Sequence, residues 1–283
     1  MRKAVAGAVL GAVAAEAAYS ALIRRPPREA KLWLRTNHRG EPVTLLEGPA
    51  FVAGAVAAVA VAPGVPARMR TAAIFAGSAA GALGAYDDLA GSGDSRGFKG
   101  HLSALARGEV TTGAVKILGI GAAGLVAAAL AGTKARSLRG ALLDTLINGA
   151  LVAGSANLLN LFDLRPGRAI KVGVLAGLPG ALSGSAVAAA PLGAAVALLP
   201  EDLGERAMLG DAGANALGAL IGLSAAGLNR PARLGLLAGV TALNAASEFV
   251  SFTKVIQATP PLQWLDQLGR RPAVPEARPT DTE

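Results

Sequence analysis

The chain has 283 residues, of which 52% are hydrophobic and 16% are charged, and its formal net charge is +8. A mean hydropathy of +0.46 excludes an ordinary soluble domain and predicts an all-α membrane protein whose helices form a bundle. The chain contains no cysteine, which excludes disulfides, thiolate nucleophiles and metal sites with cysteine ligands.

Nine apolar stretches are candidates for membrane spans, since crossing a hydrocarbon core of about 30 Å takes about 20 residues, or fewer where the bilayer is thin. They lie at residues 3–23, 49–66, 70–86, 112–131, 138–157, 169–182, 184–200, 212–228 and 232–250. The sixth and seventh share one apolar run, which could form two short spans with a break near 180–184 or one long tilted helix. Glycine pairs at Gly7/Gly11, Gly77/Gly81 and Gly218/Gly222 favour close helix packing.

The charges predict the orientation of these spans. Six cations follow the first stretch, between residues 24 and 39, whereas only Arg2 and Lys3 precede it. The positive-inside rule therefore puts the N-terminus outside and, nine spans later, the C-terminus in the cytoplasm. With this topology the outer loops contain no aspartate or glutamate, although they are basic. We expect a multi-pass protein of the cell membrane with its active site on the cytoplasmic face.

The two ends of the chain are interpreted as follows. The first stretch could be a signal peptide, but Glu16 within it and the basic cluster after it favour an uncleaved anchor. We expect one transmembrane catalytic domain at 1–257, then an interfacial helix around 264–268 and a disordered cytoplasmic tail within 258–283. The positive charge fits loops that face anionic lipids, so we expect no nucleic-acid partner.

Carboxylate and amide side chains recur where the predicted spans reach the cytoplasmic side. They form three segments, and Glu205 is a fourth acidic position: the segments are Asp87-Asp88, Asn157-x-x-Asn160-x-x-Asp163 and Gly210-Asp211-x-Gly213. Mg²⁺ selects such oxygen ligands, typically one or two protein carboxylates together with water and phosphate. Nearby cations can neutralise phosphate oxygens in a transition state, namely Lys99, Arg165, Arg168 and Lys171. The pattern predicts phosphoryl transfer, although Asp211 could also be a simple helix cap.

In order and spacing, these segments resemble those of the polyprenyl-phosphate N-acetylhexosamine-1-phosphate transferases. This family, glycosyltransferase family 4, includes the translocase that makes lipid I and the GlcNAc-1-phosphate transferases. The similarity extends from Thr36-Asn37 to the ninth stretch. It implies that a polyprenyl phosphate of the undecaprenyl type attacks the β-phosphate of a UDP-amino sugar. The implied products are a polyprenyl diphospho-sugar for cell-envelope glycans such as peptidoglycan, and UMP, with Mg²⁺ as cofactor.

The resemblance also implies roles for individual residues. Asp87 and Asp88 would engage the lipid phosphate, and Asp211 would bind Mg²⁺ with Asn160 as a second ligand. Asp163 would act in the nucleotide-sugar site, and Lys99 would contact phosphate. The remaining substrate-binding candidates are Asn157, Asn160, Arg165, Arg168, Lys171 and Asn37. The implied partners are polyprenyl phosphate, a UDP-amino sugar and the membrane, and a homodimer is possible.

Three features depart from the family pattern. The sequence Leu164-Arg165-Pro166-Gly167-Arg168 replaces the usual glycine after Asp163. A His-rich loop after the ninth span is missing, since the histidines are His38 and His101, and the chain ends where a tenth span is expected. The sugar therefore stays open, as does the alternative of an inactive relative that serves as a membrane scaffold or lipid-binding partner. A transporter is disfavoured because its ionisable groups would lie near the middle of the membrane.

Overall fold

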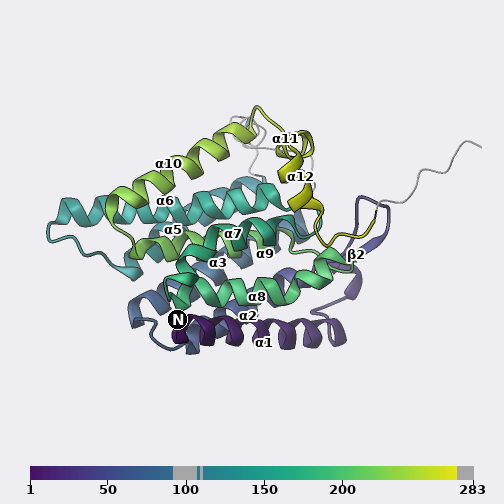
Figure 1. Ribbon diagram of the computed structural model, residues 1–283, viewed down its shortest axis with the longest axis horizontal. Coiled ribbons are helices and arrows are strands. Elements are labelled where there is room, and N and C mark those ends of the chain that lie inside the picture. The colour runs from purple at the N-terminus through teal and green to yellow at the C-terminus, as the bar shows by residue number, and fades with distance from the viewer. Residues whose placement is uncertain (92–106, 109–110, 273–283) are drawn as a thin grey trace, which may run out of the picture.

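The computed structural model describes residues 1–91, 107–108 and 111–272, and this part of the chain is almost entirely helical (Figure 1). Its long helices are α1 (Arg2–Arg24), α2 (Glu47–Val61), α3 (Ala67–Ala90), α5 (Thr112–Ala131), α6 (Leu138–Phe162), α7 (Arg168–Leu182), α8 (Ala186–Leu203), α9 (Gly210–Ser224) and α10 (Arg230–Ser247). Each predicted apolar stretch overlaps one of these helices, which lie side by side in a bundle (Figure 1). The prediction of an all-α helical bundle is confirmed.

Four of the described helices are long and apolar enough to cross a membrane by themselves, namely α1, α5, α6 and α8. A fifth span results if α10 and α11 (Phe252–Ala258), which meet at an angle of 97°, form one broken span. Three others, α2, α7 and α9, have 15 residues each, which makes them shorter than a typical span. The long apolar helices are compatible with a membrane protein, and the count of nine spans stays a prediction.

The apolar run at 170–200 forms two helices, which answers the question left open by the sequence. Gly184, between α7 and α8, has a φ of +93°, a backbone conformation that residues with a Cβ rarely adopt. Ser185 then caps α8, because its side chain accepts a hydrogen bond from the Ala188 N–H. The chain therefore turns at 183–185.

The centre of the bundle is α9, which contacts α2, α3, α6, α7 and α8. Every residue from 212 to 223 is buried. A Cβ on Gly218 would lie 2.2 Å from the Ser155 carbonyl oxygen, and one on Gly222 would lie 2.5 Å from that of Leu151. The backbones of α9 and α6 thus touch, as the glycine spacing predicted.

Segment 24–48 is more ordered than a simple loop. It contains the 3₁₀ helix η1 (Ala30–Trp33) and the antiparallel strands β1 (Leu34–Thr36) and β2 (Pro42–Thr44). The Asn37 side chain closes the hairpin turn by accepting hydrogen bonds from the N–H groups of Arg39 and Glu41. Thr44 exchanges backbone hydrogen bonds with Arg206 and Met208. The hairpin is therefore attached to the link between α8 and α9.

The C-terminal part of the described chain turns back over the same end of the bundle. After α11 comes α12 (Pro260–Gln267), which overlaps the range 264–268 where an interfacial helix was predicted. A second 3₁₀ helix, η2 (Ala225–Gly227), links α9 to α10. The rest of the predicted tail, residues 273–283, lies outside the described residues, as do Lys99 and His101.

Candidate active site

The start of α9 is capped by a carboxylate from another helix. Asp88, in the last turn of α3, accepts hydrogen bonds from the N–H groups of Asp211 (3.1 Å) and Ala212 (3.0 Å). Since no side chain of its own caps α9, Asp88 satisfies two N–H groups that have no partner within the helix. The approach requires Gly84, where a Cβ would lie 2.2 Å from the Asp211 carbonyl oxygen. Asp88 therefore positions Asp211.

Asp87 and Asp211 converge on a single cation, the ammonium group of Lys116. Its Nζ lies 2.6 Å from Oδ2 of Asp87 and also bonds Oδ2 of Asp211. The three side chains come from α3, α9 and the first turns of α5. Lys116 was not among the predicted site residues, although a charged residue inside an apolar stretch is a functional candidate in a membrane protein. That signal would have found it.

Asp163 reaches the same region from the end of α6. Its carboxylate accepts a hydrogen bond from the Gly210 N–H. It is also close enough to three other carboxylates for electrostatic repulsion between them, namely Asp202, Asp211 and Asp88. Burial of the carboxylate, followed by these like charges, raises the pKa of Asp163 well above its ordinary value. A cation bound nearby would favour the ionised form.

Two further buried carboxylates extend this acidic end of the bundle. Glu47, at the start of α2, is fully buried, and neither of its carboxylate oxygens has a hydrogen-bond partner among the described residues. Asp202, near the end of α8, is 3% exposed, and its Oδ2 also lacks a partner there. The sequence did not predict either residue as part of the site. Buried charge without a partner is costly, so this region favours an added positive charge.

The donor atoms fit a magnesium ion. In the described part of the chain, no group of three or more His, Asp or Glu residues is arranged to hold a metal ion. Mg²⁺ needs fewer, since it is usually bound by one or two carboxylates and keeps waters and substrate phosphates as its other ligands. Asp87 and Asp211 already share one cationic group. They are therefore the best candidates, and the role of Asn160 as a second ligand stays a prediction.

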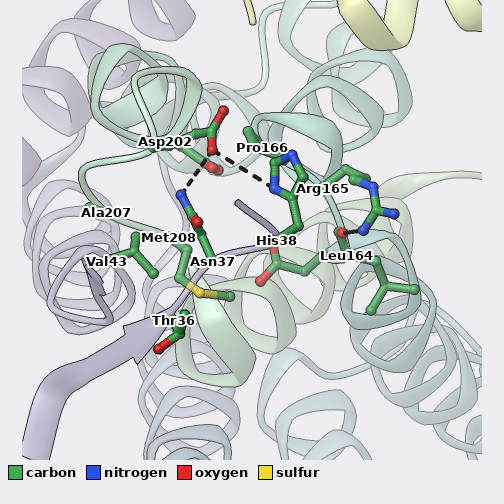
Figure 2. Close-up of a pocket in the computed structure, with 12 residues that line it drawn as sticks. Thr36, Asn37, His38, Val43, Leu164, Arg165, Pro166, Asp202, Ala207 and Met208 are labelled. Atoms are coloured by element: carbon green, nitrogen blue, oxygen red, sulfur yellow. Dashed lines mark hydrogen bonds and ion pairs between the residues drawn. The ribbon is translucent and has the colours of Figure 1, made fainter. Parts of the chain in front are cut away.

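A pocket of about 300 Å³ opens beside Asp163 and Asp202. In Figure 2 the side chains of Asn37 and His38 point from the hairpin turn to one carboxylate, where two dashed lines meet. This carboxylate is Glu205, whose Oε2 lies 2.9 Å from Nδ2 of Asn37 and 3.8 Å from Nδ1 of His38. Burial lowers the pKa of His38, which favours the neutral form of the ring. This end of the hairpin therefore forms a polar wall of the pocket.

Glu205 has an unusual backbone conformation, with a φ of +56°. A left-handed conformation costs a residue with a Cβ about 1–2 kcal/mol. Its carboxylate is buried and receives a hydrogen bond of 2.8 Å from Nε of Arg39. The contacts to the hairpin stabilise this conformation, so Glu205 holds Asn37 and Arg39 in place.

A wider cavity of about 840 Å³ adjoins the first and shares His38, Arg165 and Glu205 with it. Its walls also include Arg39, Arg270 and Arg271. Most of these guanidinium groups have acidic partners in the protein, but Arg165 donates to the Leu164 carbonyl. A mouth with this many arginines suits an anionic ligand such as a diphosphate. Asn37 lines the first pocket and Arg165 lines both cavities, and their substrate-binding roles stay predictions.

Three predicted substrate-binding residues point elsewhere. Nδ2 of Asn157 donates to Oδ1 of Asn244 in α10 at 2.6 Å. Arg168 is buried and pairs with Asp266 at 2.8 Å, and the Lys171 ammonium donates to carbonyl groups at the end of α12. These contacts hold α10 and α12 in place, and the substrate-binding roles of the three residues stay predictions. Asn157 and Asp163 are also about 120° apart around an α-helix, so they do not share one face.

The structure thus gathers Asp87, Asp88, Asp163 and Asp211 at one end of the bundle and adds Lys116. No protein-family model matches the chain, and a search of curated proteins finds no match. Function must therefore be inferred from the chemistry of these residues.

Proposed function

We propose that this protein transfers a sugar-1-phosphate, of the N-acetylhexosamine type, from a UDP-sugar to a polyprenyl phosphate. The observation that carries the proposal is the convergence of Asp87, Asp163 and Asp211 with Lys116 at one end of an apolar helical bundle. Phosphoryl transfer depends on positioning and on neutralising charge spread over phosphate oxygens, and this set of groups suits both tasks. The proposal includes nine membrane spans, with the N-terminus outside and this end of the bundle in the cytoplasm.

The acceptor would approach through the lipid, because its phosphate travels at headgroup depth. Lys116 pairs with Asp87 in the last turn of α3, and we assign it to the acceptor phosphate, whose oxygens would take the place of one aspartate partner. An acceptor oxygen then attacks the β-phosphorus of the donor. A new P–O bond forms, the bond from the β-phosphorus to the oxygen bridging it to the α-phosphate breaks, and UMP leaves with that electron pair.

The donor would occupy the pocket beside Asp163 and the basic cavity that adjoins it. Arg165 faces this cavity with no acidic partner in the described part of the chain, so it can pair with the diphosphate. Mg²⁺, held by Asp87 and Asp211, would supply electrostatic stabilisation of the diphosphate. Asp88 keeps Asp211 at the start of α9, and is therefore a positioning residue.

A second candidate is an inactive protein that binds polyprenyl phosphate without transferring anything to it. One observation favours it: Lys116 already neutralises Asp87 and Asp211, the two carboxylates that would hold Mg²⁺. Both candidates bind the lipid, but only the transferase releases UMP.

The test uses the purified full chain with undecaprenyl phosphate, Mg²⁺ and a panel of UDP-sugars, with UMP release as the readout. We expect UMP from at least one UDP-amino sugar, dependent on both the lipid and Mg²⁺. Asp211→Asn serves as the inactive variant, and Glu29→Gln, an exposed carboxylate on the 24–48 segment, as the matched control. Lipid binding without UMP release from any donor would favour the inactive protein.

A further inference from the structure

The end of the bundle opposite to the carboxylates contains a cavity of about 590 Å³. It is bordered by the start of α3, the end of α5, the first turns of α6 and the link from η2 to α10. Three cationic side chains line it, Arg68, Lys134 and Arg233, against one carboxylate, Asp144. The balance of charge is thus the reverse of that at the other end.

Asp144 does not neutralise this cavity, because its own charge is already shared. Its carboxylate accepts hydrogen bonds from Thr133 (2.7 Å), from Nε of Arg230 (2.8 Å) and from Nη2 of Arg233 (3.0 Å). One negative charge therefore faces two guanidinium groups before Arg68 and Lys134 are considered. The cavity keeps a surplus of positive charge.

Arg233 provides an independent sign of a missing ligand. The residue is 7% exposed, and its two terminal nitrogens donate to Asn148 and Asp144. Its Nε is buried and has no hydrogen-bond partner among the residues that the structure describes. A buried charged donor without an acceptor costs free energy, so an acceptor oxygen within the cavity would relieve that cost.

The other walls of the cavity also favour an anion. Arg68 and Lys134 are exposed side chains that form no ion pair or hydrogen bond with the described residues. The first turn of α3, whose residues 66–69 border the cavity, has neither a side-chain cap nor an acidic residue. Its free N–H groups and the helix dipole attract negative charge.

We propose that this cavity binds a phosphate group, either the headgroup phosphate of an anionic lipid or a free phosphate ion. The oxygens of one phosphate can accept hydrogen bonds from Arg233 Nε and pair with the flexible cations Arg68 and Lys134. The inference does not depend on the proposed transferase activity, because none of these residues belongs to the acidic end.

Thermal unfolding of the full chain in a neutral detergent tests the proposal. The ligands added are a short-chain phosphatidylglycerol, the matching phosphatidylcholine and inorganic phosphate. Arg68→Gln/Lys134→Gln removes two exposed cations of the cavity. Arg136→Gln/Arg139→Gln removes two exposed cations near the same end that do not line the cavity, and is the matched control.

We expect phosphatidylglycerol to stabilise the wild type and the control alike, and to bind the cavity variant roughly tenfold more weakly. Stabilisation by phosphatidylglycerol but not by inorganic phosphate assigns the site to a lipid headgroup. Equal stabilisation by inorganic phosphate assigns it to the free ion. Either a wild type that no phosphate ligand stabilises, or a cavity variant that binds as well as the control, would overturn the proposal.

Discussion

The two ends of the bundle differ in whether their buried carboxylates have partners within the protein. At one end Asp144 is surrounded by Arg230, Arg233 and Thr133, so its charge is fully compensated within the protein. At the other end neither Glu47 oxygen and only one Asp202 oxygen has a hydrogen-bond partner in the described part of the chain, and several aspartates share Lys116 and the first N–H groups of α9. A paired buried charge supports the fold, whereas a surplus of buried charge is retained where a ligand supplies the opposite sign.

The largest effect should come from removing charge at the acidic end. Asp211→Asn keeps the size of the side chain but loses the charge that Lys116 and a magnesium ion would share. We expect UMP release to fall by at least about a thousandfold, since a metal ion contributes several kcal/mol of charge stabilisation. Turnover measured over a range of Mg²⁺ concentrations checks this. Unchanged turnover would make Asp211 a structural residue like Asp144.

At the opposite end of the bundle, we expect a substitution to lower the stability of the protein and to leave its turnover unchanged. Asp144→Ala leaves Arg230 and Arg233 without their carboxylate, and breaking a buried ion pair costs about 3–5 kcal/mol. We expect a lower unfolding temperature in detergent, with UMP release per folded molecule unchanged. Arg136→Ala, at an exposed position near the same end, is the control and should leave both quantities as they are. A specific loss of turnover in folded Asp144→Ala would contradict the division between the two ends.

Within the acidic end, Asp87 and Asp88 should differ. Asp87 faces Lys116 and the proposed reactants, so Asp87→Asn should lower turnover by about a hundredfold. In Asp88→Asn one oxygen can still accept a hydrogen bond from α9, and we expect about a tenfold loss together with about 1 kcal/mol of stability. Turnover and denaturant unfolding of both variants, side by side, decide the order. If Asp88→Asn lost more turnover than Asp87→Asn at unchanged stability, Asp88 and not Asp87 would be the residue that faces the reactants.

The surplus of acid also predicts how stability depends on pH. The pKa of Asp163 is raised in the folded protein, so its ionisation opposes folding. Stability from this group is complete below the ordinary pKa of an aspartate and is lost as the pH rises toward the raised value, by at most about 1.4 kcal/mol per pH unit. We therefore expect the stability of Asp163→Asn, relative to that of the wild type, to be higher at pH 8 than at pH 4. Thermal unfolding of both proteins at both pH values measures this. If the variant and the wild type differ by the same amount at pH 4 and pH 8, the ionisation of Asp163 does not oppose folding.

The smallest effect should be at Asn157, which belongs to neither charged end. Because its amide bonds Asn244, Asn157→Ala should cost about 1 kcal/mol of stability. The affinity for a UDP-sugar, measured by calorimetry, should stay unchanged, whereas Asp163→Ala should weaken it. Loss of binding in Asn157→Ala would restore the interpretation that the sequence favoured.

Much of the fold followed from the sequence, because apolar stretches and their flanking residues are local signals. All nine predicted stretches overlap observed helices, whereas the sequence left open whether the run at 170–200 breaks, and the structure shows the break at Gly184. The hairpin at 34–44 was not predicted, since two three-residue strands have too few residues to show a period. It is stabilised by backbone hydrogen bonds to residues 206 and 208, which are remote in the sequence.

The sequence by itself determined the helical class, the apolar helices and the grouping of Asp87, Asp88, Asp163 and Asp211 at one end, because helix ends alternate along a bundle. Only the tertiary structure decided which groups touch. It brought Lys116 between Asp87 and Asp211, turned Asn157 toward α10 and paired Arg168 with Asp266. The reason is physical: spacing along a helix fixes the direction in which a side chain points. Its partner depends on how a neighbouring helix is rotated and packed, and the local sequence pattern carries no information about that.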